Sequence, residues 1–319
     1  MKNKNFNFFL FVIYIIIILI ILNHLFIDEI NILRSKASNL IHNGDELVCI
    51  DTHMDENNNF KPNTTFTFSG CSVYLPTTKY RINSYGLRGP EISLIKPNKS
   101  YRIISLGDSV TFGWGINEKD TFSNVLEKKL KKKSNKNIEV INLGIPGYSA
   151  LDEVAQFETL GLKFNPDMVL ITFVGNDWEN EELMKIHDDF LLNLTKKNCP
   201  FGCSEEEELS SYFATQNYMR NAHFFDTFAT INNSYRRIDE IAKTNNMVVV
   251  AGFFGGGGEW KLALFELCKE LGWECVDLKK FHHIDYARYF LNVADTHPNK
   301  LAHKEIAKIY EEKIINYCK

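Results

Sequence analysis

The sequence has little excess charge of either sign. Its formal net charge is −4, with 36 lysines and arginines against 40 aspartates and glutamates. Proteins that bind nucleic acid usually carry a clear basic excess, so this balance excludes a global positive field and gives no support for a nucleic-acid partner. The chain also shows no internal repeat. Hydrophobic residues make up 45% and charged residues 24% of the chain, as in an ordinary globular protein.

Paired Cys-x-x-Cys motifs and histidine clusters, the usual signatures of a zinc site, are missing as well. The sequence does contain 7 cysteines, which is more typical of an exported chain than of a cytosolic one. Spacing alone does not fix their connectivity, and the odd number leaves one thiol over. We nevertheless expect the cysteines to form disulfides and not a metal site. The candidate pairs are Cys199 with Cys203, Cys49 with Cys71, and Cys268 with Cys275.

Charge is almost absent from one stretch near the amino terminus. Residues 8–27 are nearly all apolar, with two lysines before the run and Asp28 and Glu29 directly after it. A helix of this length spans about 30 Å, the thickness of a bilayer's hydrocarbon core. The positive-inside rule then predicts a single-pass anchor, with the amino terminus in the cytoplasm and the rest of the chain outside. A cleaved signal peptide, which would leave a secreted protein, is the alternative.

Composition divides the chain into three regions. Residues 1–27 form the cytoplasmic tip and anchor. Residues 28–97 are polar and lack a long helical period, which favours a stalk followed by a small accessory segment. Within it, residues 80–90 have the glycine and proline punctuation of an ordered turn that can pack on the main domain. A surface salt bridge is the expected role of Arg88, and contact with a substrate is the alternative. Residues 98–319 form the main domain.

Apolar runs rich in Val and Ile alternate with helical patterns from residue 101 onward. This alternation predicts an α/β fold with a parallel sheet covered on both faces. The strand candidates are Arg102–Leu106, Val140–Leu143, Met168–Val174, Met247–Phe254 and Cys275–Leu278. The helix candidates are Asp120–Lys133, Leu151–Leu162, Trp260–Leu271 and Lys300–Tyr317. Residues 178–243 exceed a simple crossover, and we expect them to add helices beside the site as a lid or substrate wall.

Four short motifs stand at the ends of these elements. They are Gly107-Asp108-Ser109, Asn142-Leu-Gly144-Ile-Pro-Gly147, Gly175-Asn176-Asp177 and Asp295-Thr296-His297. Each of the first three directly follows a predicted strand, and the fourth opens the last helix. Because the carboxyl ends of parallel strands meet at one edge of a sheet, the motifs should converge where open α/β sheets bind their ligands.

The residue types in these motifs suit ester chemistry through a serine nucleophile. Ser109 would attack the carbonyl carbon, and His297 would take its proton and later return it to the departing alcohol. Asp295 is the nearest carboxylate that can orient the imidazole and stabilise its charged form. The backbone N–H groups of Ser109 and Gly147, with the side-chain amide of Asn176, would form the oxyanion hole.

Each assignment has a simpler structural alternative. Ser109 can be a turn serine, and Asn176 a helix cap. Asp108 is expected to be structural, with bonds to the local backbone. Ser149 is a rival nucleophile, but it lacks the Gly-x-Ser-x-Gly elbow and is better placed to cap the next helix. His303 is expected to pack or to hydrogen-bond at the helix surface.

In order and spacing, the four motifs resemble the SGNH (GDSL-type) esterase and acyltransferase superfamily. The four residues in its name map onto Ser109, Gly147, Asn176 and His297, and the resemblance covers roughly residues 101–317. It implies a three-layer α/β/α sandwich with a flavodoxin-like, five-stranded parallel sheet, without a metal or a cofactor. One feature departs from the usual pattern: one residue, rather than two, separates Asp295 from His297.

The expected function is that of a membrane-anchored serine esterase. It would hydrolyse acyl esters, O-acetyl esters included, through an acyl-Ser109 intermediate. The expected partners are an acyl-ester small molecule or an acylated glycan, and the membrane through the amino-terminal helix. One alternative is an O-acyltransferase that acts on a cell-envelope polysaccharide. A second is a non-catalytic, envelope-anchored binding protein on the same scaffold.

Overall fold

A computed structural model of the chain describes most of the main domain and part of the accessory segment. The described residues are 53–55, 59–68, 78–177, 224–254, 259–278, 286–291 and 295–319, with the single helical positions 185, 189, 191 and 193. The proposed anchor, most of the stalk, most of residues 178–223 and two candidate disulfides (Cys49–Cys71 and Cys199–Cys203) lie outside this set. Among the helices within it, none combines the length and apolarity that a bilayer crossing requires.

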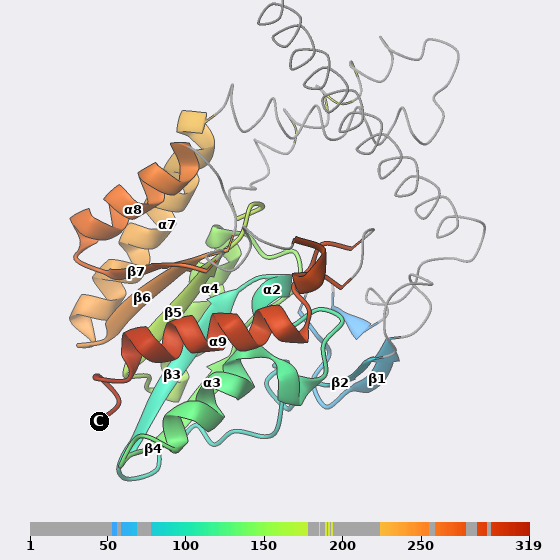
Figure 1. The fold of residues 1–319 in the computed structure, drawn as a ribbon, viewed down its shortest axis with the longest axis vertical. Coiled ribbons are helices and arrows are strands. Elements are labelled where there is room, and N and C mark those ends of the chain that lie inside the picture. The colour runs from blue at the N-terminus through green and yellow to red at the C-terminus, as the bar shows by residue number, and fades with distance from the viewer. Residues whose placement is uncertain are drawn as a thin grey trace, which may run out of the picture.

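A five-stranded parallel sheet forms the centre of the main domain (Figure 1). Its order is β4-β3-β5-β6-β7, which corresponds to the flavodoxin-like order 2-1-3-4-5. Its strands are β3 (Ser100–Gly107), β4 (Asn137–Asn142), β5 (Met168–Phe173), β6 (Val248–Phe253) and β7 (Glu274–Asp277). All five overlap the strands predicted from the apolar runs. β5 is buried along its whole length, as expected for a strand with helices on both sides.

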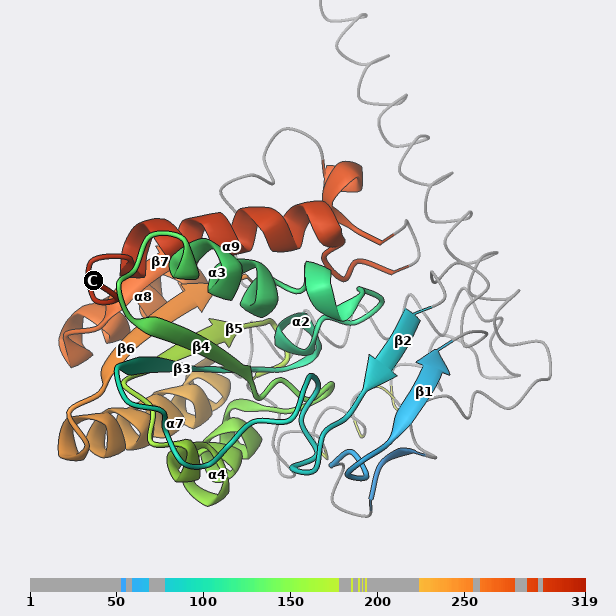
Figure 2. The ribbon, with the colours of Figure 1, turned by 90° about the horizontal axis from the view of Figure 1, so that it is seen from below.

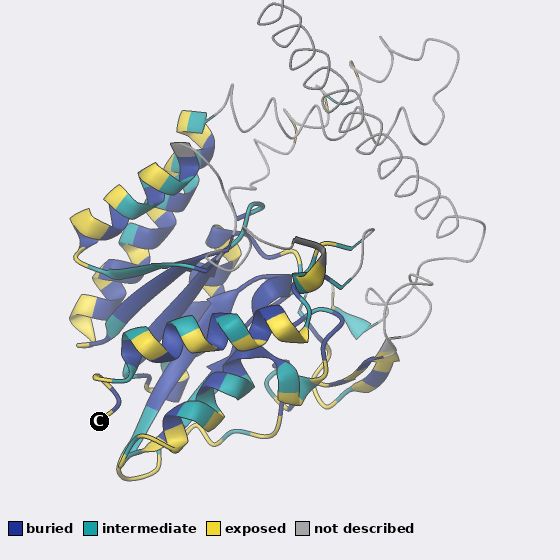
Figure 3. Ribbon diagram, in the orientation of Figure 1, coloured by how far each residue is buried: buried dark blue, intermediate teal, exposed yellow. Residues whose placement is uncertain are grey.

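Alternate residues of each strand point to opposite helical layers. Ile104 and Val169 pack toward α4, α7 and α8, whereas Ile103 and Met168 pack toward α3 and α9. Figure 2 shows α3 and α9 on one side of the sheet and α4 and α7 on the other. The buried faces of the helices meet the sheet, and their exposed faces point outward (Figure 3). The long helices are α3 (Phe122–Lys131), α4 (Ala150–Thr159), α7 (Phe224–Thr244), α8 (Glu259–Leu271) and α9 (Lys300–Ile314).

Side-chain caps set where three of these helices begin. The Thr121 hydroxyl accepts from the Asn124 N–H at α3, and Ser149 forms a capping box with Asp152 at α4, as predicted. At α9, Asn299 accepts from Leu301 and Ala302. Such caps satisfy the backbone N–H groups that the first turn leaves free. The short helices are α2 (Ser109–Phe112), η2 (Glu118–Asp120), η3 (Gly161–Phe164) and η4 (Tyr286–Tyr289).

Helix α7 lies within the long segment between the third and fourth strands of the sheet. Its residues Ile231, Tyr235 and Ile238 are buried in the same core as α4. This part of the segment is therefore the crossover helix between β5 and β6, and it covers the sheet. Close to it, a disulfide joins Cys268 in α8 to Cys275 in β7, one of the three candidate pairs.

The accessory segment packs against the main domain. Its two antiparallel strands, β1 (Thr65–Phe68) and β2 (Thr78–Arg81), lie beside α2 in both Figure 1 and Figure 2. Phe60, Phe66, Tyr80 and Ile82 form one buried cluster with Phe112, Ile145 and Tyr148 of the main domain. This cluster contains residues from α2 and from the loop after β4. The accessory segment therefore packs under the turn that carries Ser109 and under the loop that carries Gly147.

The expected surface salt bridge of Arg88 is wrong. Arg88 is only 4% exposed, and its guanidinium donates to the carbonyl oxygens of Phe112, Gly113 and Ile116. It also stacks over the rings of Tyr80 and Phe112. A planar group with five donors suits three carbonyls that converge at the end of a helical turn, so these carbonyls hold the guanidinium inside the protein.

Candidate active site

Ser109 stands at the turn between β3 and α2. Gly107, the last residue of β3, has φ +150°, and a Cβ atom there would lie 2.1 Å from Thr111 Oγ1, so the turn requires glycine. Asp108 caps α2 by accepting from the Val110 N–H at 2.9 Å, which makes Ser109 the first helical residue. The serine is recessed, with 8% of its surface exposed.

The structure brings Ser109, His297 and Asp295 together in one chain of hydrogen bonds. His297 Nε2 lies 2.8 Å from Ser109 Oγ, and His297 Nδ1 lies 2.6 Å from Asp295 Oδ1. A proton on Nδ1, facing the carboxylate, leaves the Nε2 lone pair free to accept from the serine hydroxyl. The three side chains therefore have the geometry of a nucleophile, its base and an orienting carboxylate.

The one-residue spacing between Asp295 and His297 is compatible with this geometry. Asp295 Oδ1 accepts both from the ring nitrogen and, at 2.9 Å, from the backbone N–H of His297. Asp295 is thus bonded to both the backbone and the ring of His297, and these two bonds orient the imidazole although only one residue separates the pair. Next to it, the Nδ2 group of Asn299 donates to the carbonyls of Arg288 and Phe290, and Leu291 N–H donates to the His297 carbonyl.

Burial and hydrogen bonding act in opposite directions on Asp295. Burial raises the pKa of its carboxyl, but the hydrogen bonds and charge of His297 and the Trp114 N–H prevail and hold the pKa below its ordinary value. Asp295 is therefore ionised at neutral pH, as the stabilisation of an imidazolium requires.

Asp108 bonds the local backbone, as expected, and its side chain also contacts the Ser109 hydroxyl. Its Oδ2 lies 3.0 Å from Ser109 Oγ, on the nucleophile itself. Complete burial raises the pKa of the Asp108 carboxyl, although bonds from Val110 and Ser109 and the nearby His297 oppose this shift. The Ser109 hydroxyl has one hydrogen, so it can donate to His297 or to Asp108 but not to both at once.

The loop that carries Gly147 adjoins the Ser109 turn, and the loop that carries Asn176 is bonded to the residues that follow Gly147. The Ile145 N–H donates to the Gly107 carbonyl at 3.2 Å, and the Ala150 N–H donates to the Asp177 carbonyl at 2.9 Å. Gly147 has φ +82°, and apart from the glycine and its two chain neighbours no described atom lies within 4 Å of the position a Cβ would occupy. Its backbone therefore borders open space, into which a ligand can approach.

Three residues near the site were not given their observed roles by the sequence patterns. Trp114 donates its indole N–H to Asp295 Oδ2 at 3.2 Å. His303 packs and hydrogen-bonds, as expected, since it stacks on Phe122 and its Nδ1 accepts from the Phe122 N–H. It is fully buried, however, and does not lie at the helix surface; burial lowers its pKa to about 3. Glu153 is buried in α4 and forms no hydrogen bond through its carboxyl with the described residues.

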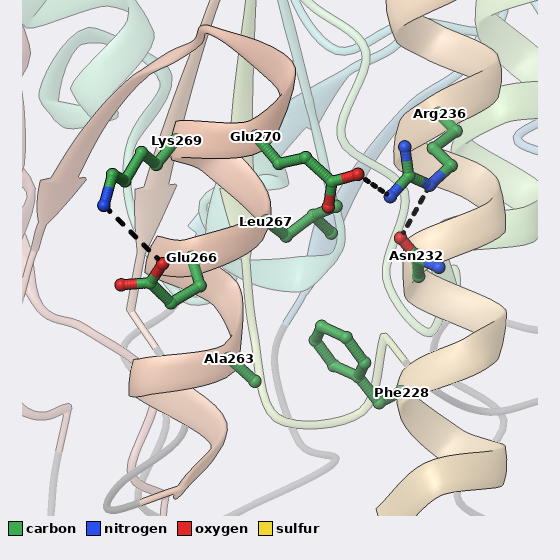
Figure 4. A pocket seen from close by; sticks show the side chains of 8 residues that line it. All are labelled: Phe228, Asn232, Arg236, Ala263, Glu266, Leu267, Lys269 and Glu270. Atoms are coloured by element: carbon green, nitrogen blue, oxygen red, sulfur yellow. Dashed lines mark hydrogen bonds and ion pairs between the residues drawn. The ribbon is translucent and has the colours of Figure 1, made fainter.

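An open pocket of about 620 Å³ lies between α7 and α8, apart from these residues (Figure 4). Arg236 of α7 reaches across it to Glu270 of α8 at 2.7 Å and also bonds Asn232 of its own helix at 3.0 Å. These are surface pairs, and none of the sequence-predicted site residues lines the pocket. The remaining lining residues are Phe228, Ala263, Glu266, Leu267 and Lys269.

A serine paired with a histidine and a carboxylate at the carboxyl edge of an open α/β sheet defines the class of serine-dependent hydrolases. The sequence model of the GDSL-like lipase/acylhydrolase family matches residues 105–305 of the chain. The chain belongs to this family, and the protein is a hydrolase that acts on ester bonds.

Several solved structures are similar to this chain at low sequence identity. TesA is 12% identical over 67% of this chain and 97% of its own, with a TM-score of 0.45. The psychrotrophic esterase EstA from Pseudoalteromonas sp. is 14% identical over 68% and 97%, with a TM-score of 0.45. The family 3 carbohydrate esterase of Clostridium thermocellum is 15% identical over 69% and 98%, with a TM-score of 0.46. Among curated proteins, none matches the chain.

Proposed function

We propose that the protein is a serine esterase that cleaves acyl esters through a covalent Ser109 intermediate. The observation that carries this proposal is the unbroken chain of hydrogen bonds from Ser109 Oγ through His297 to Asp295. A serine hydroxyl is a weak nucleophile without a base in hydrogen-bond contact, and here the base is both in contact and oriented.

The reaction has two acyl-transfer steps. Ser109 Oγ attacks the carbonyl carbon while its proton passes to His297 Nε2, and the resulting imidazolium is stabilised by ionised Asp295. His297 then gives this proton to the departing alkoxide, which leaves as the alcohol and an acyl-Ser109 ester. In the second step, a water molecule gives a proton to His297 and attacks the acyl group, and the proton returns to Ser109 Oγ as the acid leaves.

The developing oxyanion needs donors on the side of the carbonyl opposite the base. We assign these donors to the backbone N–H groups of Ser109 and Gly147 and to the Asn176 side-chain amide. The open space at Gly147 and the linked loops after β4 and β5 support this assignment. Loss of one such donor typically costs about 100- to 1000-fold in turnover.

Acyl esters, O-acetyl esters of glycans included, are the proposed substrates. The apolar run at residues 8–27, with lysines before it and acidic residues after it, supports an anchored enzyme whose catalytic domain lies outside the cytoplasmic membrane. A panel of acyl chain lengths and acetylated glycans, given to the full-length protein, tests the substrate class. Acyl transfer to an added glycan that outpaces hydrolysis would assign the alternative O-acyltransferase activity.

The decisive variant for the catalytic role is Ser109→Ala. We expect it to abolish hydrolysis of p-nitrophenyl acetate and labelling by a fluorophosphonate probe, while circular dichroism shows an intact fold. Ser149→Ala is the matched control, because Ser149 is the other candidate nucleophile and caps α4. It should keep its activity and lose about 1 kcal/mol of stability. Full activity in Ser109→Ala would refute the proposed function.

A further inference from the structure

The carboxylate of Asp295 is held from two sides. Its Oδ1 faces His297, while its Oδ2 accepts the indole N–H of Trp114 at 3.2 Å. The Trp114 ring also lies beside the imidazole, with 5.7 Å between ring centroids and an interplanar angle of 31°. One residue on the nucleophile's side of the site thus contacts both other members of the triad.

Trp114 stands in a tight turn directly after α2. The N–H groups of Gly113 and Trp114 both donate to the Ser109 carbonyl, at 2.9 Å and 3.0 Å. Gly113 has φ +86°, and a Cβ there would lie 2.6 Å from Thr121 Cγ2, so a side chain would force the turn open. The position of the indole is therefore coupled directly to the backbone of the nucleophile.

The accessory segment braces this turn from outside. The buried guanidinium of Arg88 donates to carbonyls on both sides of Trp114, those of Gly113 and Ile116. The Tyr80 hydroxyl accepts from the Gly115 N–H at 2.8 Å. Burial lowers the pKa of Arg88 to about 10, which still leaves the guanidinium charged at neutral pH. Charge-assisted bonds to carbonyls in a dry environment are strong, so the turn has little freedom to shift.

We propose that Trp114 is a positioning residue of the triad, and that Arg88 and Tyr80 hold it in place. This inference rests on the proposed serine-esterase function. Asp295 and His297 share one short loop, so the bond between them does not by itself fix their position relative to Ser109. The indole supplies that link: it holds Oδ2, while Oδ1 bonds His297 Nδ1, and its ring limits rotation of the imidazole.

The test removes the indole N–H and keeps an aromatic ring. In the full-length protein, we expect Trp114→Phe to lower kcat for p-nitrophenyl acetate on the order of 10-fold, the usual effect of losing one hydrogen bond to a charged group. KM should stay within about twofold, because the residue acts on the triad and not on substrate binding. Trp273→Phe is the matched control, because Trp273 also donates its indole N–H to a carboxylate, that of Asp239, at 2.9 Å. Trp273 directly precedes β7 and so lies at the amino end of the strands, away from the triad at their carboxyl ends. This control substitution should leave kcat unchanged.

A double-mutant cycle shows whether Trp114 acts through Asp295. In an Asp295→Ala background, measured by residual turnover and by the rate of fluorophosphonate labelling, Trp114→Phe should cost less than about twofold. An equal cost in both backgrounds, or a loss confined to KM, would overturn the proposal, because Trp114 would then act on the substrate or through packing alone. Failure of the proposed function is a separate result: Ser109→Ala would then retain activity, whatever the cycle shows.

Discussion

At the scale of single residues, the Ser109 hydroxyl proton has two acceptors within reach. His297 Nε2 lies at 2.8 Å and Asp108 Oδ2 at 3.0 Å. Only donation to His297 prepares the serine for attack. Because burial raises the pKa of Asp108, a protonated Asp108 can donate to Ser109 Oγ while the serine donates to His297. A neutral donor at position 108 would then be compatible with catalysis.

Substitution of Asp108 tests this distribution of protons. Asparagine can still cap α2 through its Oδ1, and its Nδ2 can donate to Ser109 Oγ. We therefore expect Asp108→Asn to retain most of its turnover, whereas Asp108→Ala loses about 1 kcal/mol of stability with the cap and lowers kcat. Esterase assays and thermal unfolding of both variants provide the measurement. A loss of turnover in Asp108→Asn as large as that in Asp108→Ala would show that the negative charge of Asp108 is required.

The placement of single site residues was predictable only where a motif coincides with the end or start of an element. Ser109 and His297 stand at a strand end and a helix start, so alternating apolar runs and short motifs were enough to pair them. The bond between Trp114 and Asp295 joins residues 181 positions apart. No local periodicity encodes such a contact, and the only available signal was an aromatic residue between two glycines just after the nucleophile turn.

At the scale of elements, the turn that carries Arg88 acts as a clamp on the end of α2. Arg88→Lys keeps the charge but replaces a planar fork with a single ammonium, which cannot reach three carbonyls in that geometry. We expect it to lower the free energy of unfolding by about 2 kcal/mol, through buried carbonyls that lose a donor, and to lower kcat. Chemical denaturation and esterase assays measure the two effects.

Arg81→Lys is the control for this clamp. Arg81 belongs to the same accessory segment, but it forms an exposed pair with Glu118 at 2.8 Å. Such pairs contribute about 0–1 kcal/mol, so neither stability nor turnover should change much. Equal effects of the two substitutions would argue against a specific role for Arg88.

The elements themselves were largely readable from sequence, and the exceptions have a physical reason. β3 and β5 are long apolar runs buried on both faces, and α4 and α9 begin at strong capping residues. The burial of Arg88 was not predictable, because an arginine next to glycine and proline is usually exposed. Only the three carbonyls of the α2 turn, which come from a different part of the chain, make a buried guanidinium favourable there.

At the scale of the whole molecule, one buried carboxyl makes the stability depend on pH. Glu153 lies in α4 beneath the site, near Asp108 and Asp152, and burial together with these neighbours raises its pKa well above the ordinary 4.5. The folded protein therefore keeps a proton on Glu153 that the unfolded chain releases. Because the folded state binds more protons, the stability from this group is complete below about pH 4.5 and is lost as the pH rises toward the folded pKa.

Glu153→Gln removes this titration with little change in shape. Above the ordinary carboxyl pKa, the wild-type protein should lose about 1.4 kcal/mol per pH unit relative to the variant, until the folded state also ionises. Unfolding free energies measured from about pH 4 to pH 8 should therefore converge at the acid end and diverge toward neutral pH, with the variant more stable. Glu158→Gln removes a carboxyl from a more exposed position of α4, where Glu158 pairs with Arg237, and is the control for the loss of one charge. Parallel curves for wild type and Glu153→Gln would show that Glu153 is ionised in the folded protein, and its burial would then require a donor from the chain or from internal water.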